Sequence, residues 1–299
     1  MRKALAENLV ELISKDKKVV FLTGDLGFGV FDELQKKYPD NYLNVGIAES
    51  NMVALAAGLG SKGFKPIVYS IASFVTSRPY EFTKILAGYN SIPIVLIGAG
   101  GGLTYSTSGG THHSLDDLSL MLGIPEIEVF SPAGPKELKQ SLKVALGLQQ
   151  TSYIRIGKFG EKDVLDFEYS SSPVKIVNGR EVAIFSHGNT SLECLKAALD
   201  FNLESVEKVA YFHFPFLQNI DWNKVYNEIE NIKNIVVVEE SWPIGSLHSK
   251  LLHSEKFSKV KVHRLGPPFK FIVEHDEHLN LQKKFGYSSD AIKEFINQL

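Results

Sequence analysis

Residues 42–70 read YLNVGIAESNMVALAAGLGSKGFKPIVYS and carry a clear strand–helix–strand pattern. Tyr42 to Val45 is a short apolar run typical of a buried strand, and Pro66 to Ser70 is another. Between them, Ser50 to Ser61 is rich in Ala, Leu and Met, residues that favour a helix. The pattern predicts two strands of a mostly parallel sheet with a helix packed against it.

The same alternation extends over the chain on both sides of this stretch. In the first half we expect further strands at residues 19–22, 92–97, 128–131 and 152–156, and helices at 1–16, 31–38, 79–88, 115–122 and 135–148. In the second half we expect strands at 181–186, 206–212, 235–240 and 260–265, and helices at 190–202, 222–231, 244–254 and 290–298. The pattern therefore continues to the end of the chain.

Residues 159–174, FGEKDVLDFEYSSSPV, interrupt this alternation with charges, three serines and a proline, which indicates a linker. We therefore expect an α/β protein made of two three-layer α/β/α domains with mostly parallel sheets. The expected domains span residues 1–165 and 175–299.

Composition excludes several classes of protein. Of 299 residues, 44% are hydrophobic and 22% charged, so the chain is not disordered, collagen-like or a disulfide scaffold. A formal charge of −2 provides no bulk attraction for nucleic acid or an anionic membrane. Charges interrupt the N-terminal segment, and no apolar run approaches the ~20 residues of a membrane helix, so we expect a cytoplasmic protein.

The single cysteine, Cys194, excludes an intrachain disulfide. It stands beside Leu192 and Leu195 on an expected helix, which favours a buried thiol over a nucleophile.

Two glycine-rich stretches, residues 24–29 and 98–102, each follow an expected strand. Both could present backbone N–H groups to an anion, and both are also compatible with a simple tight turn. Neither is a dinucleotide fingerprint, since in the second stretch the third glycine position is Leu103.

Glu49 is a sharper candidate, because it lies between a strand end and the start of an Ala-rich helix. A carboxylate there lies at the carboxyl edge of the sheet, where α/β proteins form their sites. The alternative is an acid that only complements the helix dipole.

His112 and His113 follow a second glycine-rich segment. They lack the i, i+4 spacing of a helical metal pair and have no cysteine nearby, so no metal site is expected. A histidine in such a loop is a candidate for catalysis or substrate binding, and a surface pair is the alternative. Phe74 and Tyr80 bracket a segment that could present an aromatic ring to a ligand, although most aromatic residues are core.

The order of these motifs resembles the transketolase family. The resemblance rests on TGDLG at residues 23–27, NVGIAES at 44–50, GAGGGLTYSTSGGTHHSLDD at 98–117, IVVVEESWPIGSL at 235–247 and FGYSSDAIKEFI at 285–296. It covers nearly the whole chain and implies the pyrimidine-binding domain of thiamine-diphosphate enzymes followed by the family's C-terminal domain.

The resemblance also implies that something is missing. The family binds the diphosphate and Mg²⁺ through a GDG motif followed by Asn on a separate domain, whereas Gly24-Asp25-Leu26 lacks the second glycine. The chain thus resembles the second subunit of a split transketolase that transfers a two-carbon ketol unit between sugars or sugar phosphates. The implied partner is an N-terminal subunit carrying GDG…N and Mg²⁺, in an α₂β₂ assembly.

For the cofactor, the resemblance assigns Glu49 to N1′ of the aminopyrimidine, where a shared proton favours the imino tautomer that activates the thiazolium C2. Phe74 would stack on the pyrimidine ring, Tyr80 would be a second aromatic residue of that pocket, and Asp25 would lie near the cofactor.

For the substrate, the resemblance assigns His112 to the carbonyl or hydroxyl groups, and Arg2 and Lys158 to the sugar phosphate. The family usually has Arg at the position of Lys158. Family positions that contact the sugar or the pocket are occupied here by Gly29, Ser77, Gly100 and Ser108. These differences indicate an altered substrate, with His113 as a candidate replacement contact.

Two alternatives stay open. A component similar to deoxyxylulose-phosphate synthase or to the 2-oxoacid-dehydrogenase E1 β chain would share the same pyrimidine domain. Such a component would use a 2-oxo acid and release CO₂. A non-catalytic structural partner is the alternative of another class, and the presence of Glu49, Phe74 and His112 argues against it.

Overall fold

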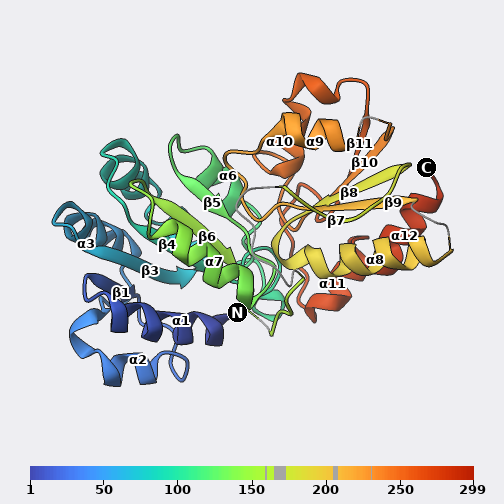
Figure 1. Cartoon of the computed structure of the whole chain (residues 1–299). Helices are drawn as coiled ribbons and strands as arrows, with labels where there is room; N and C mark the ends of the chain where they lie inside the picture. The colour runs from blue at the N-terminus through green and yellow to red at the C-terminus, as the bar shows by residue number, and fades with distance from the viewer. Residues whose placement is uncertain (159, 165–172, 205–207, 230) are drawn as a thin grey trace.

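The computed structural model describes residues 1–158, 160–164, 173–204, 208–229 and 231–299, and contains two sheets side by side (Figure 1). The first sheet has the order β2-β1-β3-β4-β6-β5, and all its neighbouring strands are parallel. Its strands are β1 (Val19–Thr23), β2 (Tyr42–Asn44), β3 (Lys65–Ile71), β4 (Val95–Ala99), β5 (Glu128–Phe130) and β6 (Ser152–Ile156).

The helices around this sheet are α1 (Arg2–Lys15), α2 (Asp32–Lys37), α3 (Glu49–Ser61), α4 (Ala72–Ser77), α5 (Tyr80–Phe82), α6 (Asp117–Leu122) and α7 (Pro135–Ala145). Three short helices complete the domain: η1 (Pro39–Asn41), the π-helix η2 (Thr83–Tyr89) and η3 (Ser106–Ser108). Alternate residues of each strand pack on opposite sides. In β1, for example, Phe21 faces a cluster with α1 and α7, and Leu22 faces a cluster with α3 and α6.

The second sheet has the order β11-β10-β8-β9-β7 and is parallel except for β7, which runs antiparallel to β9. Its strands are β7 (Val174–Val177), β8 (Val182–Ser186), β9 (Val209–His213), β10 (Asn234–Val238) and β11 (Lys261–Leu265). Its helices are η4 (Gly188–Thr190), α8 (Ser191–Glu204), α9 (Trp222–Glu228), α10 (Leu247–Leu252), η5 (Glu255–Phe257), α11 (His278–Lys284) and α12 (Ser289–Asn297). The prediction of an α/β fold with two mostly parallel sheets is confirmed.

Four elements differ from those expected from the sequence. The single helix expected over 79–88 is α5 followed by the π-helix η2, and α4, which was not predicted, precedes it. Pro79 separates α4 from α5, because it has no N–H for a continuous helix. Strand β7 and helix α11 were not predicted, since both are short and only partly apolar. Residues 159 and 165–172 of the expected linker, and residues 206–207 of an expected strand, lie outside the described residues.

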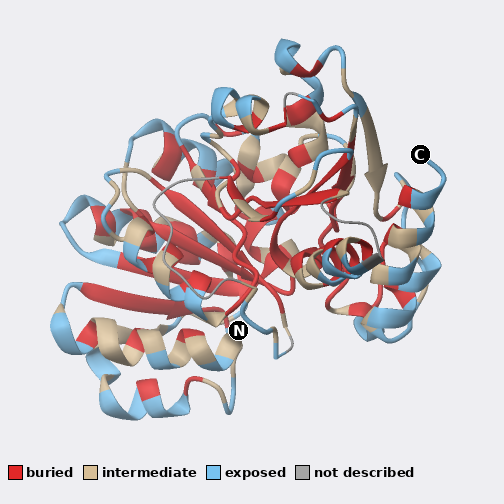
Figure 2. Ribbon diagram, turned by 45° about the vertical axis from the view of Figure 1, so that its right-hand side comes forward, coloured by how far each residue is buried: buried red, intermediate tan, exposed pale blue. Residues whose placement is uncertain are grey.

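The two domains share one hydrophobic cluster, which is why they pack closely. It includes Val129 from the first sheet and Phe212 and Val237 from the second. An isolated bridge pairs Phe130 with Phe216, and the Leu217 N–H donates to the Val129 carbonyl at 2.8 Å. Figure 2 shows the buried strands of both sheets meeting at the centre of the molecule.

Candidate active site

The carboxyl ends of the parallel strands β1, β2, β3, β4 and β6 lie along one edge of the first sheet, and the candidate residues follow them. Such edges are where ligands bind in open α/β sheets.

Glu49 is the first residue of α3, and only 3% of its surface is exposed. Its Oε2 accepts a hydrogen bond of 2.8 Å from Nη1 of Arg78. Its Oε1 accepts one of 3.2 Å from the Ser70 hydroxyl, which is also buried. Each carboxylate oxygen therefore has a donor inside the protein, and the sheet edge carries an almost fully buried acid.

Arg78 is a site residue that the sequence analysis missed. Its guanidinium carbon lies 3.8 Å from the centre of the Phe74 ring, so the cation covers one face of this ring and, through its hydrogen bond, connects the ring to Glu49. Arg78 and Phe74 are four residues apart at the end of α4, a spacing that places side chains on one helix face. That spacing was the signal available in the sequence.

Asp25 ties together the loops after β1 and β2. Its backbone is left-handed, with φ of 59°, and its N–H donates to Oδ1 of Asn44 at 3.0 Å. In return, Nδ2 of Asn44 donates to Oδ1 of Asp25 at 3.1 Å. Gly24 brings this loop close to the acid, because a Cβ there would lie 3.9 Å from Oε1 of Glu49.

His112 lies between two aromatic rings. Its ring centre is 5.3 Å from that of Phe74 and 5.6 Å from that of Tyr105. Partial burial, and then the charges of Lys158 and Arg78, lower the pKa of His112. The imidazole is therefore neutral near pH 7 and can donate or accept a hydrogen bond.

Two positively charged side chains lie beside His112. Nζ of Lys158 lies 4.2 Å from the centre of the Tyr105 ring, and burial followed by the charge of Arg2 lowers the pKa of Lys158. Burial raises the pKa of the Tyr69 and Tyr105 hydroxyls, and the charge of Arg2 partly opposes this increase. The first turn of α1 and the end of β6 thus bring two cations together beside the histidine.

The packing of Tyr105 explains why residue 100 is a glycine. Gly100 has a φ of 79°, and a Cβ there would lie 2.0 Å from the Tyr105 ring. Tyr105 therefore takes the space that a larger side chain would need. Ser108, by contrast, is exposed in η3.

His113 points to a groove between the domains, rather than to the same place as His112. It lines this groove with Phe74 and Arg78 from the first domain and with Trp242 and Phe271 from the second. His113 is buried, and this burial lowers its pKa. Ser77 lies in the same wall.

Tyr80 and Gly29 lie outside the group formed by Glu49, Phe74 and His112. Tyr80 packs against the hydrophobic cluster of the sheet, with its hydroxyl next to Gly123. Gly29 lines a different groove between α1 and α2, and its N–H donates to Oδ1 of Asp32 at 2.9 Å. The structure thus brings together Glu49, Phe74 and His112, and beside them Arg2 and Lys158.

Other expectations concern the rest of the chain. Cys194 is fully buried in α8, and burial raises the pKa of its thiol to about 12, which confirms the expectation of a buried thiol. Across the described residues, no three His, Cys, Asp or Glu side chains are arranged to hold a metal ion. In that same part of the chain, no helix is both long and apolar enough to cross a membrane.

The chain belongs to the transketolase family. Residues 1–158 match the transketolase pyrimidine binding domain, and residues 173–292 match the transketolase C-terminal domain.

Known relatives include an apulose-4-phosphate transketolase subunit of Actinobacillus succinogenes, which is 29% identical over 86% of this chain and 84% of that protein. The protein of the same name from Phocaeicola vulgatus is 26% identical over 93% and 90%. The 1-deoxy-D-xylulose-5-phosphate synthase of Halothermothrix orenii is 29% identical over 96% of this chain, but over only 46% of its own length.

Among solved structures, a split-gene transketolase in an inactive β4 tetramer superimposes with a TM-score of 0.88 at 25% identity, covering 99% of this chain and 97% of that one. The transketolase of Campylobacter jejuni, at 18% identity, has a TM-score of 0.83 over all of this chain and 46% of its own. This last likeness concerns the fold alone.

Proposed function

We propose that this chain is the second subunit of a split transketolase, which supplies the pyrimidine half of a thiamine-diphosphate site and transfers a ketol unit between sugars or sugar phosphates. The observation that carries the proposal is the pairing of a buried acid, Glu49, with the aromatic face of Phe74 at the carboxyl edge of a parallel sheet.

These two residues fit the aminopyrimidine of the cofactor. A flat heteroaromatic ring needs an apolar face to stack on, which Phe74 offers, and an acid to bind its ring nitrogen, which Glu49 offers. When bound, thiamine diphosphate supplies a thiazolium carbon that adds to a ketose carbonyl and stabilises the negative charge after C–C cleavage. Asp25, held by Asn44, would help to shape the loop next to this ring.

Glu49 has the central role in this proposal, that of a carboxyl group that holds a proton at N1′. His112, neutral near pH 7, would donate a hydrogen bond to the substrate oxygen. Arg2 and Lys158 would hold the phosphate of a sugar phosphate, and Lys158 would do so as a point charge rather than through a bidentate fork. His113 would contact the substrate from the groove wall.

A partner subunit would hold the diphosphate and Mg²⁺, and the active assembly would be α₂β₂. Two relatives are themselves named as single subunits of a transketolase, which supports a split enzyme. The chain spans about half the length of the deoxyxylulose-phosphate synthases it matches, at 46–47%. The inactive β4 tetramer of the neighbour supports self-association without activity when the partner is absent.

The test is reconstitution with the N-terminal subunit, identified by its GDG…N motif. We expect ketol transfer and exchange of the thiazolium C2 proton in the complex, and neither with this chain alone. Glu49→Gln should abolish both while leaving the fold intact, because the amide cannot hold the proton that N1′ requires. Glu81→Gln, at an exposed position, is the matched control. Unchanged exchange in the Glu49→Gln complex would remove Glu49 from the mechanism, and turnover by this chain alone would refute the split enzyme.

A second candidate is a synthase that uses a 2-oxo acid, favoured by the 29% identity to a deoxyxylulose-phosphate synthase over 96% of this chain. Donor use distinguishes the two: this candidate requires CO₂ release from a 2-oxo acid, whereas a transketolase uses a ketose without release of CO₂.

A further inference from the structure

We propose that Arg78 occupies the place of the cofactor's pyrimidine ring in the free subunit, and that its side chain must swing out before the cofactor binds. The inference rests on the proposed function, and it adds a displacement step to it. Arg78 would thus be a positioning residue, which keeps the pyrimidine pocket filled until the cofactor arrives.

The geometry of the guanidinium is the first observation. It is a flat, delocalised group that lies 3.8 Å from the Phe74 ring centre and donates an N–H to Oε2 of Glu49 at 2.8 Å. An aminopyrimidine bound by this pair needs the same two contacts, a stacking face and a carboxylate acceptor. Since both contacts are already made by Arg78, the two groups exclude each other.

The surroundings show that this side chain is free to leave while the acid is not. Glu49 is 3% exposed, whereas 44% of the Arg78 side chain is exposed, so the cation has a direct path to water. The backbone is anchored, because the Ser50 hydroxyl donates to the Arg78 carbonyl at 3.2 Å. Displacement would therefore require rotation of one side chain rather than movement of α4.

The contact has a physical reason in the free subunit. A buried carboxylate without a charged partner is unfavourable, and a cation over an aromatic face is favourable. Arg78 donates a hydrogen bond to Glu49 and covers the Phe74 ring while the pocket holds no cofactor. Cofactor binding must then break this contact, which lowers the apparent affinity by the fraction of molecules with an open pocket.

The experiment compares the full wild-type chain with Arg78→Met, with thiamine and thiamine diphosphate as separate probes, by ligand-observed NMR titration. We expect Arg78→Met to bind both probes about tenfold more tightly, which corresponds to about 1.4 kcal/mol. The two probes carry opposite net charges. A purely electrostatic effect of removing the cation would strengthen the binding of thiamine and weaken that of the diphosphate.

Such opposite changes would overturn the inference, as would weaker binding of both probes, which would mean that Arg78 helps to hold the cofactor. Measurable but unchanged affinities would also overturn it and would leave the proposed function standing. If neither the wild type nor Arg78→Met bound either probe at millimolar concentration, removing Arg78 would open no binding site, which would overturn the inference and leave the proposed function standing, because that function places the diphosphate in the partner subunit.

Two further variants keep the result interpretable. Lys84→Met removes one exposed positive charge six residues further along the chain and should leave both affinities unchanged. Arg78→Lys keeps the charge but loses the flat face, so it should tighten binding by less than Arg78→Met. Circular dichroism and the urea midpoint show whether each variant folds. If Arg78→Met does not fold, Arg78→Lys decides: tighter thiamine binding supports displacement, and unchanged or weaker binding overturns it.

Discussion

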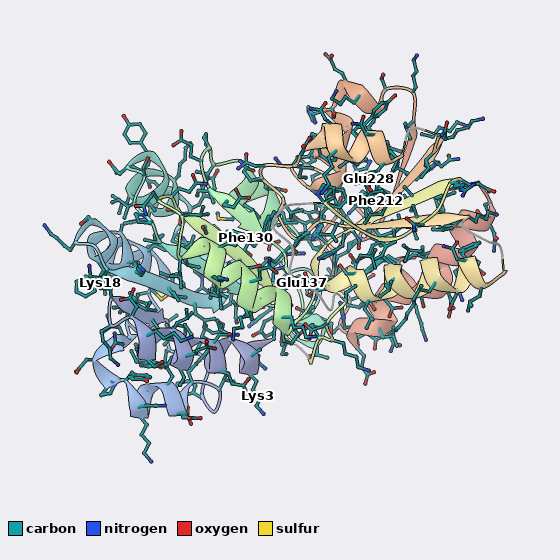
Figure 3. The ribbon with its side chains drawn as sticks, viewed as in Figure 1. Lys3, Lys18, Phe130, Glu137, Phe212 and Glu228 are labelled. Atoms are coloured by element: carbon teal, nitrogen blue, oxygen red, sulfur yellow. The ribbon has the colours of Figure 1, made fainter. Side chains whose placement is uncertain are left out.

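Nε2 of His213 lies 2.7 Å from Oε2 of Glu137, and this contact links the end of β9 in the second domain to α7 in the first. Both side chains are buried, and Figure 3 places Glu137 where the two domains meet. The same Oε2 accepts from the Ala133 N–H at 2.9 Å, and Nδ1 of His213 lies 3.0 Å from the Ser191 hydroxyl. The packing of one domain on the other thus includes a buried polar network.

Replacing His213 with Leu should lower the free energy of unfolding by about 1–3 kcal/mol, because the buried Glu137 carboxylate loses a hydrogen-bond partner. Urea denaturation followed by circular dichroism measures the change. His253→Leu, an exposed position at the end of α10, is the control and should stay within about 0.5 kcal/mol of the wild type. A wild-type midpoint for His213→Leu would show that the contact contributes no stability.

Phe74→Ala should weaken thiamine-diphosphate binding by the reconstituted complex by roughly tenfold, since loss of a stacking face removes about 0.5–1.5 kcal/mol beyond the area term. Equilibrium titration of the apo complex with cofactor measures this. Phe64→Ala is the matched control, because Phe64 is partly exposed next to the start of β3, at the opposite edge of the sheet. Equal affinities for wild type and Phe74→Ala would contradict the stacking role.

Lys158→Met should raise the KM for a phosphorylated sugar by roughly tenfold and leave the KM for the corresponding free sugar unchanged, because a phosphate contact is lost. Lys158→Arg should restore the lower KM, since the longer fork also meets a phosphate. Steady-state kinetics with both sugars makes the comparison, and Lys62→Met, on the exposed end of α3, is the control. An equal loss for both sugars would assign Lys158 a structural role.

The imidazole of His112 should titrate below its ordinary pKa of about 6.5, because burial and the charges of Lys158 and Arg78 oppose protonation. A lowered folded-state pKa means that the unfolded chain binds the proton first. The contribution of His112 to stability is therefore complete above about pH 6.5 and falls as the pH drops from there toward the folded-state pKa. Two-dimensional NMR of the ring measures the midpoint.

Lys158→Met provides the check on the cause, since removing this charge should raise the His112 midpoint. His112→Asn identifies the resonance. A midpoint at or above 6.5 in the wild type would contradict the placement of His112 beside these cations.

Local sequence determined most of the elements in this protein. The apolar run of residues 19–22 and the Ala-rich segment after Glu49 are β1 and α3 in the structure, because strand and helix periodicities depend on neighbours within a few residues. The periodicity of apolar residues predicted helices and strands less well where a segment was short or interrupted. For this reason β7 and α11 were missed, and a single helix was expected over 79–88 where the structure has α5 followed by the π-helix η2.

The motif order also singled out Glu49, Phe74 and His112, which the structure places close together. Only the tertiary structure decided what each one touches. Arg78 reaches Glu49 across 29 positions, and His213 reaches Glu137 across 76. Such contacts depend on which strands are neighbours and how the two sheets pack, and local periodicity carries no information about either. The acid was therefore visible in the sequence, while the cation that covers it emerged only from the fold.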